Sequence, residues 1–341
     1  TDENIRKIAQ FIKRFVDREG CMEFDVSAVC AIVEYSSRTA ERQDKLSTRF
    51  NHLAEILCEA VTWAKLEGAE LVTAAHIQKT IYEKEQRMKL YEEKLDEMLE
   101  ENVIMIDTEG AEIGQINGLA VLDMGNYAFG NPSRITATTY VGKSGIVNIE
   151  KEARLSGQTH DKGVQIITGF LGQTYAQNFP LSLSCRVCFE QNYNGIDGDS
   201  ASSTELYCIL SSLAELPIRQ DLAVTGSVNQ KGEIQAIGGV THKIEGFFDL
   251  CRKRGLTGTQ GVIIPVSNVK DLVLKDEVVQ AVKEGLFHIY PISKIDEGIE
   301  LLMGLSAGKK NKAGNFPANS VHGRVMKKLK AFDKRAQGEE E

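Results

Sequence analysis

The chain has 341 residues, 42% of them hydrophobic and 26% charged, a composition typical of soluble globular proteins of about two domains. Its formal net charge of −8 argues against non-specific binding to nucleic acid or anionic lipid, since both favour a basic surface. No apolar run approaches the ~20 residues that cross a bilayer, and the first ten residues lack the apolar stretch of a signal peptide. We therefore expect a cytoplasmic protein without a membrane segment or a specific nucleic-acid partner.

The seven cysteines indicate free thiols, because their number is odd and most stand in apolar or helical contexts. Cys185 and Cys188 form a C-x-x-C motif within the strand-like run LSLSCRVCFE. Side chains three apart in a strand point to opposite faces, and the sequence has no second such pair to complete a zinc site. We expect neither a metal site nor a cofactor in this chain.

Residues 1–104 predict an all-helical domain. Apolar residues recur at helical spacing in two segments, and Thr73 is a suitable N-cap for a further helix that begins at Ala74. That helix continues through EKEQRMKLYEEKLDEMLEE, whose dense mixed charge is typical of a solvated helix or of one between domains. The apolar positions are Ile5, Ile8, Phe11, Ile12, Phe15 and Val16 in the first segment, and Leu46, Phe50, Leu53, Ile56, Leu57 and Val61 in the second.

Residues 105–305 predict an α+β domain. Glycine and β-branched residues favour strands in IGQINGLAVLDMG, RITATTYVG, KGVQIITGFLG and PLSLSCRVCFEQ, and again in DLAVTGSV and GVIIPV. Helices are expected after Ser200, after Gly239 and around 269–284. Residues 306–341 predict a flexible basic tail that contains a short amphipathic stretch.

Two segments concentrate residues of catalytic type. In GIDGDSASSTELYCILSSLAEL, glycines allow a tight turn before Ser200, which stands where the free N–H groups of a helix can stabilise an oxyanion. The structural alternative makes Asp199 or Ser200 an N-cap, and Ser202 with Glu205 a capping box. In VTGSVNQKGEIQAIGGVTHKIEGFFD, Lys243 stands in the first turns of a helix after a Gly-Gly turn.

Together, these segments resemble the paired signatures of Lon proteases, a Ser in a G-x-S-A turn and a Lys after an I-G-G-[LV]-x-x-K turn. Here they are GDSA and IGGVTHK, and the separation of 43 residues (243 − 200) agrees with that family. The likeness covers about 105–304, through GQINGLA, LPIR, AVTG and GVIIP. The commonest Lon turn has Pro in place of Asp199 and Gly in place of Ser202. The variant here looks like the branch of archaeal Lon and its bacterial relatives.

This resemblance implies a serine endopeptidase in which Ser200 is the nucleophile, Lys243 the general base and Thr225 a residue that orients the lysine amine. Serine needs a neighbouring base, and a lysine serves as one only if burial lowers its pKa. The resulting acyl-enzyme is then hydrolysed by water. A histidine base is the rival, with His160, His242 or His288 as candidates. A non-catalytic Lon-type domain that forms a ring or an interaction platform is the second alternative, although it has no need for a Ser-Lys pair.

Asp199 allows two interpretations beyond the resemblance. As a latch, its carboxylate pairs with the Lys243 amine, raises the pKa of the lysine and holds the site inactive. As a cap, it only favours the positive end of the following helix.

The N-terminal helices resemble the lid of an AAA+ ATPase, which precedes the peptidase domain in Lon proteins. Arg49, or else Arg42, is a candidate nucleotide sensor, with an exposed helix arginine as the alternative. The GKS at 142–144 ends like a phosphate-binding loop, but Ala137 stands where that motif needs Gly. Because the N-terminal helices resemble a lid, we expect this chain to be the C-terminal portion of a longer ATP-dependent protease. ATP and Mg are expected only if an ATPase core precedes this chain. We also expect protein substrates and assembly into a homo-oligomeric, hexameric ring.

Overall fold

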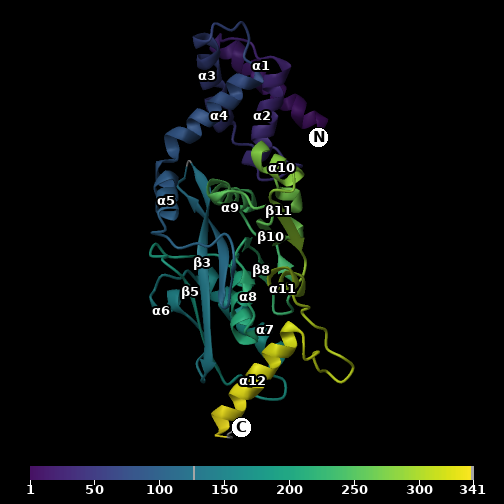
Figure 1. The fold of residues 1–341 in the computed structure, drawn as a ribbon. Coiled ribbons are helices and arrows are strands. Elements are labelled where there is room, and N and C mark those ends of the chain that lie inside the picture. Colours follow the sequence, from purple (N-terminus) through teal and green to yellow (C-terminus); the bar gives the residue numbers. More distant parts are fainter. Residues whose placement is uncertain (126, 339–341) are drawn as a thin grey trace. The chain divides into compact units, whose positions relative to one another are not determined.

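The computed structural model describes residues 1–125 and 127–338 and divides into two compact units (Figure 1). The first unit comprises Thr1–Asp96, Asp123–Ala128 and Lys270–Leu274, and the second comprises Glu97–Leu122, Phe129–Val269 and Lys275–Glu341. The division at Asp96 lies eight residues before the boundary expected at 104 (104 − 96). It falls inside helix α5 (Leu90–Glu100), so this helix belongs to both units.

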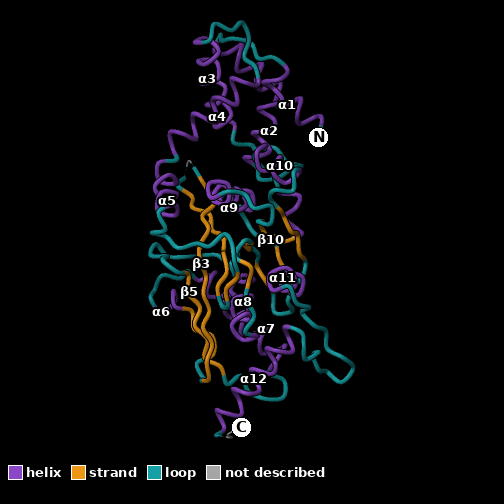
Figure 2. Tube along the Cα trace, viewed as in Figure 1, coloured by secondary structure: helices purple, strands orange, loops and turns teal. Residues whose placement is uncertain are grey.

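The first unit is helical (Figure 2). Its four complete helices are α1 (Asp2–Glu19), α2 (Val26–Thr39), α3 (Phe50–Leu66) and α4 (Ala74–Met88). They enclose one apolar core, built around fully buried residues such as Ile32, Leu53 and Leu57. Helix α4 begins after Thr73 as predicted, and the backbone N–H of Thr73 donates to His76 Nδ1 at 2.9 Å.

The second unit mixes strands and helices and confirms the predicted α+β class. Seven strands form one sheet in the order β11-β10-β7-β2-β3-β5-β4. Their bounds are β2 (Gln115–Asp123), β3 (Ala128–Val141), β4 (Gly145–Asn148), β5 (Leu183–Phe189), β7 (Leu222–Val224), β10 (Gly261–Pro265) and β11 (His288–Ile292). Two short pairs lie beside it, β1 (Ala111–Glu112) with β6 (Ile218–Arg219) and β8 (Ser227–Val228) with β9 (Ile234–Gln235).

Helices and a 3₁₀ turn follow β4 in the described chain. They are α6 (Ile149–Glu152), α7 (Gln158–Tyr175), α8 (Ser202–Ala214), α9 (Val240–Arg254), a 3₁₀ turn η1 (Val266–Asp271), α10 (Asp276–Lys283), α11 (Ile295–Met303) and α12 (Val321–Gln337). Among them, α7, α8, α9 and α11 contact strands of the sheet. Over the described residues, no helix is both long and apolar enough to traverse a bilayer.

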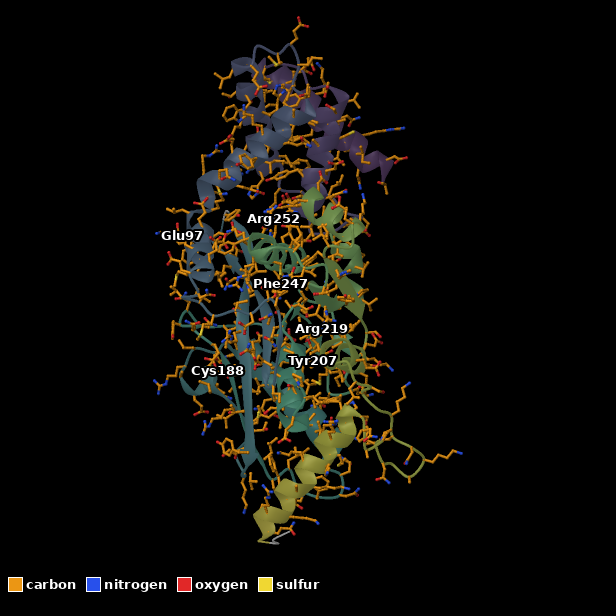
Figure 3. All side chains as sticks on the ribbon, in the orientation of Figure 1. Glu97, Cys188, Tyr207, Arg219, Phe247 and Arg252 are labelled. Carbon is orange, nitrogen blue, oxygen red and sulfur yellow. The ribbon has the colours of Figure 1, made fainter. Side chains whose placement is uncertain are left out.

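Helix α8 lies at the centre of the main core. All but one of its residues are buried, and it contacts α7, α11 and α12 (Figure 1). Figure 3 labels Tyr207 of α8, which is fully buried, and Phe247 and Arg252 of α9. In β10, Ile263 joins the core around α8, so the alternating Val262 and Ile264 face the other side of the sheet. The start of α8 is therefore held inside a packed framework.

One predicted strand is wrong. KGVQIITGFLG lies within helix α7, where Val164, Ile167 and Leu171 are buried on one face. These residues stand at the i, i+3 and i+7 positions of a helix, and packing of that face against α8 overrides the strand propensity of Val and Ile. The helices expected after Ser200 and Gly239 are present as α8 and α9.

The expected strand DLAVTGSV is interrupted. β7 ends at Val224 and β8 begins at Ser227, with Thr225 and Gly226 between them. The backbone N–H of Gly226 donates to the Ser200 carbonyl at 2.8 Å instead of to a strand. The interruption thus joins this segment to the turn that carries Ser200.

The C-terminal segment differs from the flexible tail that the sequence predicted. Helix α12 packs on α8, and Val321, Val325, Leu329 and Phe332 join the main core. These four residues follow helical spacing, so their combined burial outweighs the high charge of the segment.

We expect Leu329→Ala to lower the free energy of unfolding by about 2–5 kcal/mol, because it opens a cavity in the core that α8 and α12 share. The measurement is a urea denaturation curve, with the exposed neighbour change Lys330→Ala as the control. Equal unfolding midpoints for Leu329→Ala and the unchanged chain would show that α12 is not part of the folded core.

Candidate active site

Ser200 lies in the turn between Gly198 and helix α8. Gly198 has a φ of 91°, in the left-handed region that favours glycine. The Ser200 carbonyl accepts the Gly226 N–H at 2.8 Å and the Thr225 hydroxyl at 3.3 Å. Ser202 Oγ accepts the Val228 N–H at 3.0 Å. The turn is therefore anchored through Ser200 and Ser202 to Thr225 and Gly226, which lie between β7 and β8, and to Val228 of β8.

The helix caps that the sequence allows, an N-cap at Asp199 or Ser200 and a capping box of Ser202 with Glu205, are not formed at the start of α8. Ala201 occupies the N-cap position without a side-chain hydrogen bond, and Ser202 binds the backbone of Val228 rather than closing a capping box. Glu205, the other expected member of that box, is buried.

Lys243 stands in the first turn of α9, after Gly239 with a φ of 67°. Two glycines let strand β3 approach this turn. A Cβ on Gly130 would collide with the carbonyl of His242, and one on Gly246 with the carbonyl of Gly130. Lys243 is only 3% exposed as a result. Its Nζ donates to Ser200 Oγ at 2.8 Å and to Thr225 Oγ1 at 3.1 Å. The fold thus brings together three of the residues that the sequence singled out.

Burial changes the protonation of this lysine. It lowers the pKa of Lys243 from 10.5 to about 8, while the negative charge of Asp199 acts in the opposite direction. Near neutral pH a fraction of the amine is therefore uncharged, and the uncharged amine has a lone pair that can accept a proton.

Of the two interpretations of Asp199, the latch would require an ion pair with Lys243, and the structure gives this carboxylate another partner. Its carboxylate accepts the hydroxyl of Ser227 at 2.9 Å, while the Lys243 amine is hydrogen-bonded to Ser200. The negative charge of this carboxylate opposes the effect of burial on the pKa of Lys243. Ser227 was missed in the sequence, because its contact with Asp199 depends on the interruption between β7 and β8.

The three candidate histidine bases have other surroundings. His160 Nε2 faces Glu205 Oε1 at 3.5 Å, and His288 Nε2 lies 2.8 Å from the Gly258 carbonyl. His242 precedes Lys243 on α9. Across residues 1–125 and 127–338, the side-chain partner of Ser200 Oγ is Lys243.

The candidate nucleotide sensors lie in the first unit. Arg49 is exposed and occupies the N-cap of α3. Arg42 forms ion pairs with Asp44 at 2.9 Å and Asp271 at 3.3 Å. Of the two, Arg49 is the side chain more accessible to a ligand.

Family models match a part of each unit. Residues 187–304 match the Lon protease (S16) C-terminal proteolytic domain, and residues 23–87 match the AAA+ ATPase lid domain of archaeal LonB. The first match contains Ser200, Thr225 and Lys243, and the second contains Arg49.

Individual relatives agree with these matches. A Lon protease homolog of Escherichia coli K12 is 44% identical over 63% of this chain and 37% of its own length. A homolog of Haemophilus influenzae is 35% identical over 92% of the chain and 52% of its own length, and the archaeal Lon protease of Pyrococcus abyssi is 31% identical over 91% and 30%. The chain spans about half or less of the length of these relatives. It belongs to the Lon protease family, with a LonB-type lid ahead of a Lon proteolytic domain.

Proposed function

We propose that this chain is a serine endopeptidase that cleaves protein substrates through a dyad of Ser200 and Lys243. The observation that carries the proposal is the 2.8 Å contact between Ser200 Oγ and a buried lysine amine whose pKa is lowered to about 8. The match to the Lon proteolytic domain supports it, as do the names of the relatives.

The residues suggest the following steps. Uncharged Lys243 removes the hydroxyl proton of Ser200 as Oγ attacks the peptide carbonyl carbon. The ammonium then gives this proton to the departing amine, which leaves an ester between Ser200 and the acyl half of the substrate. Water attacks the ester while Lys243 accepts its proton, and return of that proton to Ser200 releases the acid product.

The negative charge that develops on the substrate oxygen needs donors nearby. Within the described residues, no acceptor is paired with the backbone N–H groups of Ser200 and Ala201, which directly precede α8. The positive end of this 13-residue helix favours an anion at the same place. We assign these two N–H groups to the oxyanion.

Thr225 is assigned to orienting the lysine. It is 2% exposed, and its hydroxyl accepts from Lys243 Nζ and donates to the Ser200 carbonyl. The hydroxyl thereby fixes the amine beside the serine that it must deprotonate.

Asp199→Asn is expected to raise peptide hydrolysis below pH 8, because removing the carboxylate charge lowers the pKa of Lys243 further. The rise of kcat/KM with pH should move to lower pH. An amide oxygen can still accept the Ser227 hydroxyl, so the turn stays in place. Ser227→Ala, which keeps the charge, is the control. An unchanged pH profile in Asp199→Asn would show that the charge does not act on the base.

The remaining parts of the proposal concern the longer protein. We propose that ATP and Mg act on an ATPase core outside this chain, with Arg49 as the sensor in the lid. We also propose that the protein forms a hexameric ring in the cytoplasm, where its seven free cysteines remain reduced. A monomer in light scattering at micromolar concentration, with hydrolysis retained, would contradict the ring.

The test of the function is hydrolysis of casein and of a short fluorogenic peptide by the purified chain without nucleotide. The proposal expects peptide cleavage at a rate that rises through about pH 8. Absence of cleavage, together with no reaction of Ser200 with a fluorophosphonate, would favour the alternative of a non-catalytic, ring-forming platform.

A further inference from the structure

A buried polar pair lies behind the turn that carries Ser200. His160 of α7 and Glu205 of α8 are each 1% exposed, and His160 Nε2 stands 3.5 Å from Glu205 Oε1. Neither Glu205 oxygen nor this nitrogen has a hydrogen-bond partner among the described residues. Leaving such atoms unpaired costs about 1–3 kcal/mol each, so the pair needs a compensating contact.

Both groups favour their uncharged forms. Burial lowers the pKa of His160, against the opposing effects of Asp161, Gly198 and Asp197. Burial also raises the pKa of Glu205 well above its ordinary range, and the charge of Glu150 adds to this. A protonated Glu205 can donate its O–H to a neutral imidazole, which satisfies both groups without a buried ion pair.

The histidine also holds the segment that leads to Ser200. The backbone of Gly198 hydrogen-bonds the imidazole. The Asp197 carboxylate accepts the backbone N–H groups of Thr159 at 3.1 Å and of His160 at 3.2 Å. A Cβ on Gly157 would collide with the Asp197 side chain, so only glycine permits this approach. The start of α7 therefore holds residues 197 and 198, which stand three and two positions before Ser200.

Glu205, the other member of the pair, is also connected to the turn that carries Ser200. Glu205 stands in the first turn of α8, and its backbone N–H donates to the Ala201 carbonyl at 2.9 Å. A His160–Glu205 hydrogen bond would complete a closed set of contacts from His160 to Gly198, along the chain to Ala201, and from Ala201 to Glu205. Ser200 lies on the stretch of chain between Gly198 and Ala201.

We propose that His160 and Glu205 are positioning residues, whose neutral hydrogen bond across α7 and α8 fixes the turn so that Ser200 Oγ stays within reach of Lys243. This inference rests on the proposed function. His160 does not act as a base, because it contacts Gly198 and Glu205 and not the serine hydroxyl. A displacement of the hydroxyl by about 1 Å costs up to ~100-fold in rate.

The test compares variants of the chain in peptide hydrolysis and in the rate of Ser200 labelling by a fluorophosphonate. His160→Phe and Glu205→Leu keep bulk but remove the hydrogen bond. Each is expected to lower kcat and the labelling rate by about 10- to 100-fold, with KM within about twofold. Glu205→Gln retains a neutral donor and is expected to stay within about threefold of the unchanged chain. The rise of activity with pH should stay in place, because Lys243 is unaltered.

His322→Phe is the matched control. His322 is also buried, and it contacts Tyr175 and Asp296, away from the turn. It is expected to lower Tm with kcat unchanged, which separates a loss of positioning from a general loss of stability.

The possible results separate failure of the positioning role from failure of the proposed function. Full kcat in both His160→Phe and Glu205→Leu would overturn the positioning role while leaving the dyad in place. If His160→Phe does not fold, the two Glu205 variants decide: equal kcat overturns the inference, and a tenfold difference supports it. If the unchanged chain neither cleaves peptide nor reacts at Ser200, the proposed function itself has failed.

Discussion

Ser200→Ala is expected to lower peptide hydrolysis by about 10³-fold or more while the chain remains folded. The nucleophile of the proposed mechanism, which lies 2.8 Å from the lysine amine, is lost. The Thr225 hydroxyl also contacts this amine at 3.1 Å, but it donates its own proton to the Ser200 carbonyl. The anchors of the turn use the Ser200 carbonyl, which alanine retains. The free energy of unfolding should therefore change by no more than about 1 kcal/mol.

The measurements are kcat with a fluorogenic peptide and a thermal unfolding curve for each variant. Ser212→Ala is the matched control, since Ser212 stands on α8 and its hydroxyl bonds to Thr139 at 2.8 Å rather than to the proposed base. Full hydrolysis by Ser200→Ala would remove the assignment. Equal losses in the two variants would indicate damage to α8 and not to a nucleophile.

Lys243→Met is expected to abolish hydrolysis and, at pH 7, to make the chain more stable. The pKa of Lys243 is about 8 in the folded chain and 10.5 in the reference state. The unfolded chain therefore binds more protons between these values, so folding stability rises as pH increases from 8 to 10.5. Below pH 8 the full penalty applies, and a shift of this size corresponds to about 3 kcal/mol.

Methionine fills similar space without a charge, so it removes this penalty. Loss of the hydrogen bonds to Ser200 and Thr225 offsets part of the gain. Urea denaturation at pH 7 should show the variant more stable by up to about 3 kcal/mol, and this advantage should fall as the pH rises from 8 to 10.5. The stability of Lys243→Met relative to the unchanged chain should be higher at pH 7 than at pH 10. The opposite order would contradict the claim that burial of the charged lysine destabilises the fold.

The sequence predicted helix α8, which follows Ser200, and helix α9, which carries Lys243, because strong local signals mark them. A glycine-rich turn precedes each of α8 and α9, and apolar residues follow at helical spacing. The pairing of Ser200 with Lys243 came from the resemblance to Lon proteases. Spacing in one chain does not show that residues 43 positions apart (243 − 200) meet in space.

Contacts made by distant segments could not be read from local patterns. Helix α7 resembled a strand because its buried face contains Val164 and Ile167, and its environment decides the outcome. Helix α12 resembled a solvated tail because its charges conceal a narrow apolar stripe. The contacts of Ser227 and of Glu205 arise only after β7 is interrupted and α7 packs on α8.

The most direct test of the proposed dyad is the site and the lysine dependence of covalent labelling. The intact chain is treated with a fluorophosphonate, which forms a stable bond to an activated serine, and the modified peptide is identified by mass spectrometry. We expect one adduct on Ser200, formed faster as pH rises through about 8 and lost in Lys243→Met. An adduct on another serine, or labelling of Ser200 at an equal rate in Lys243→Met, would contradict it.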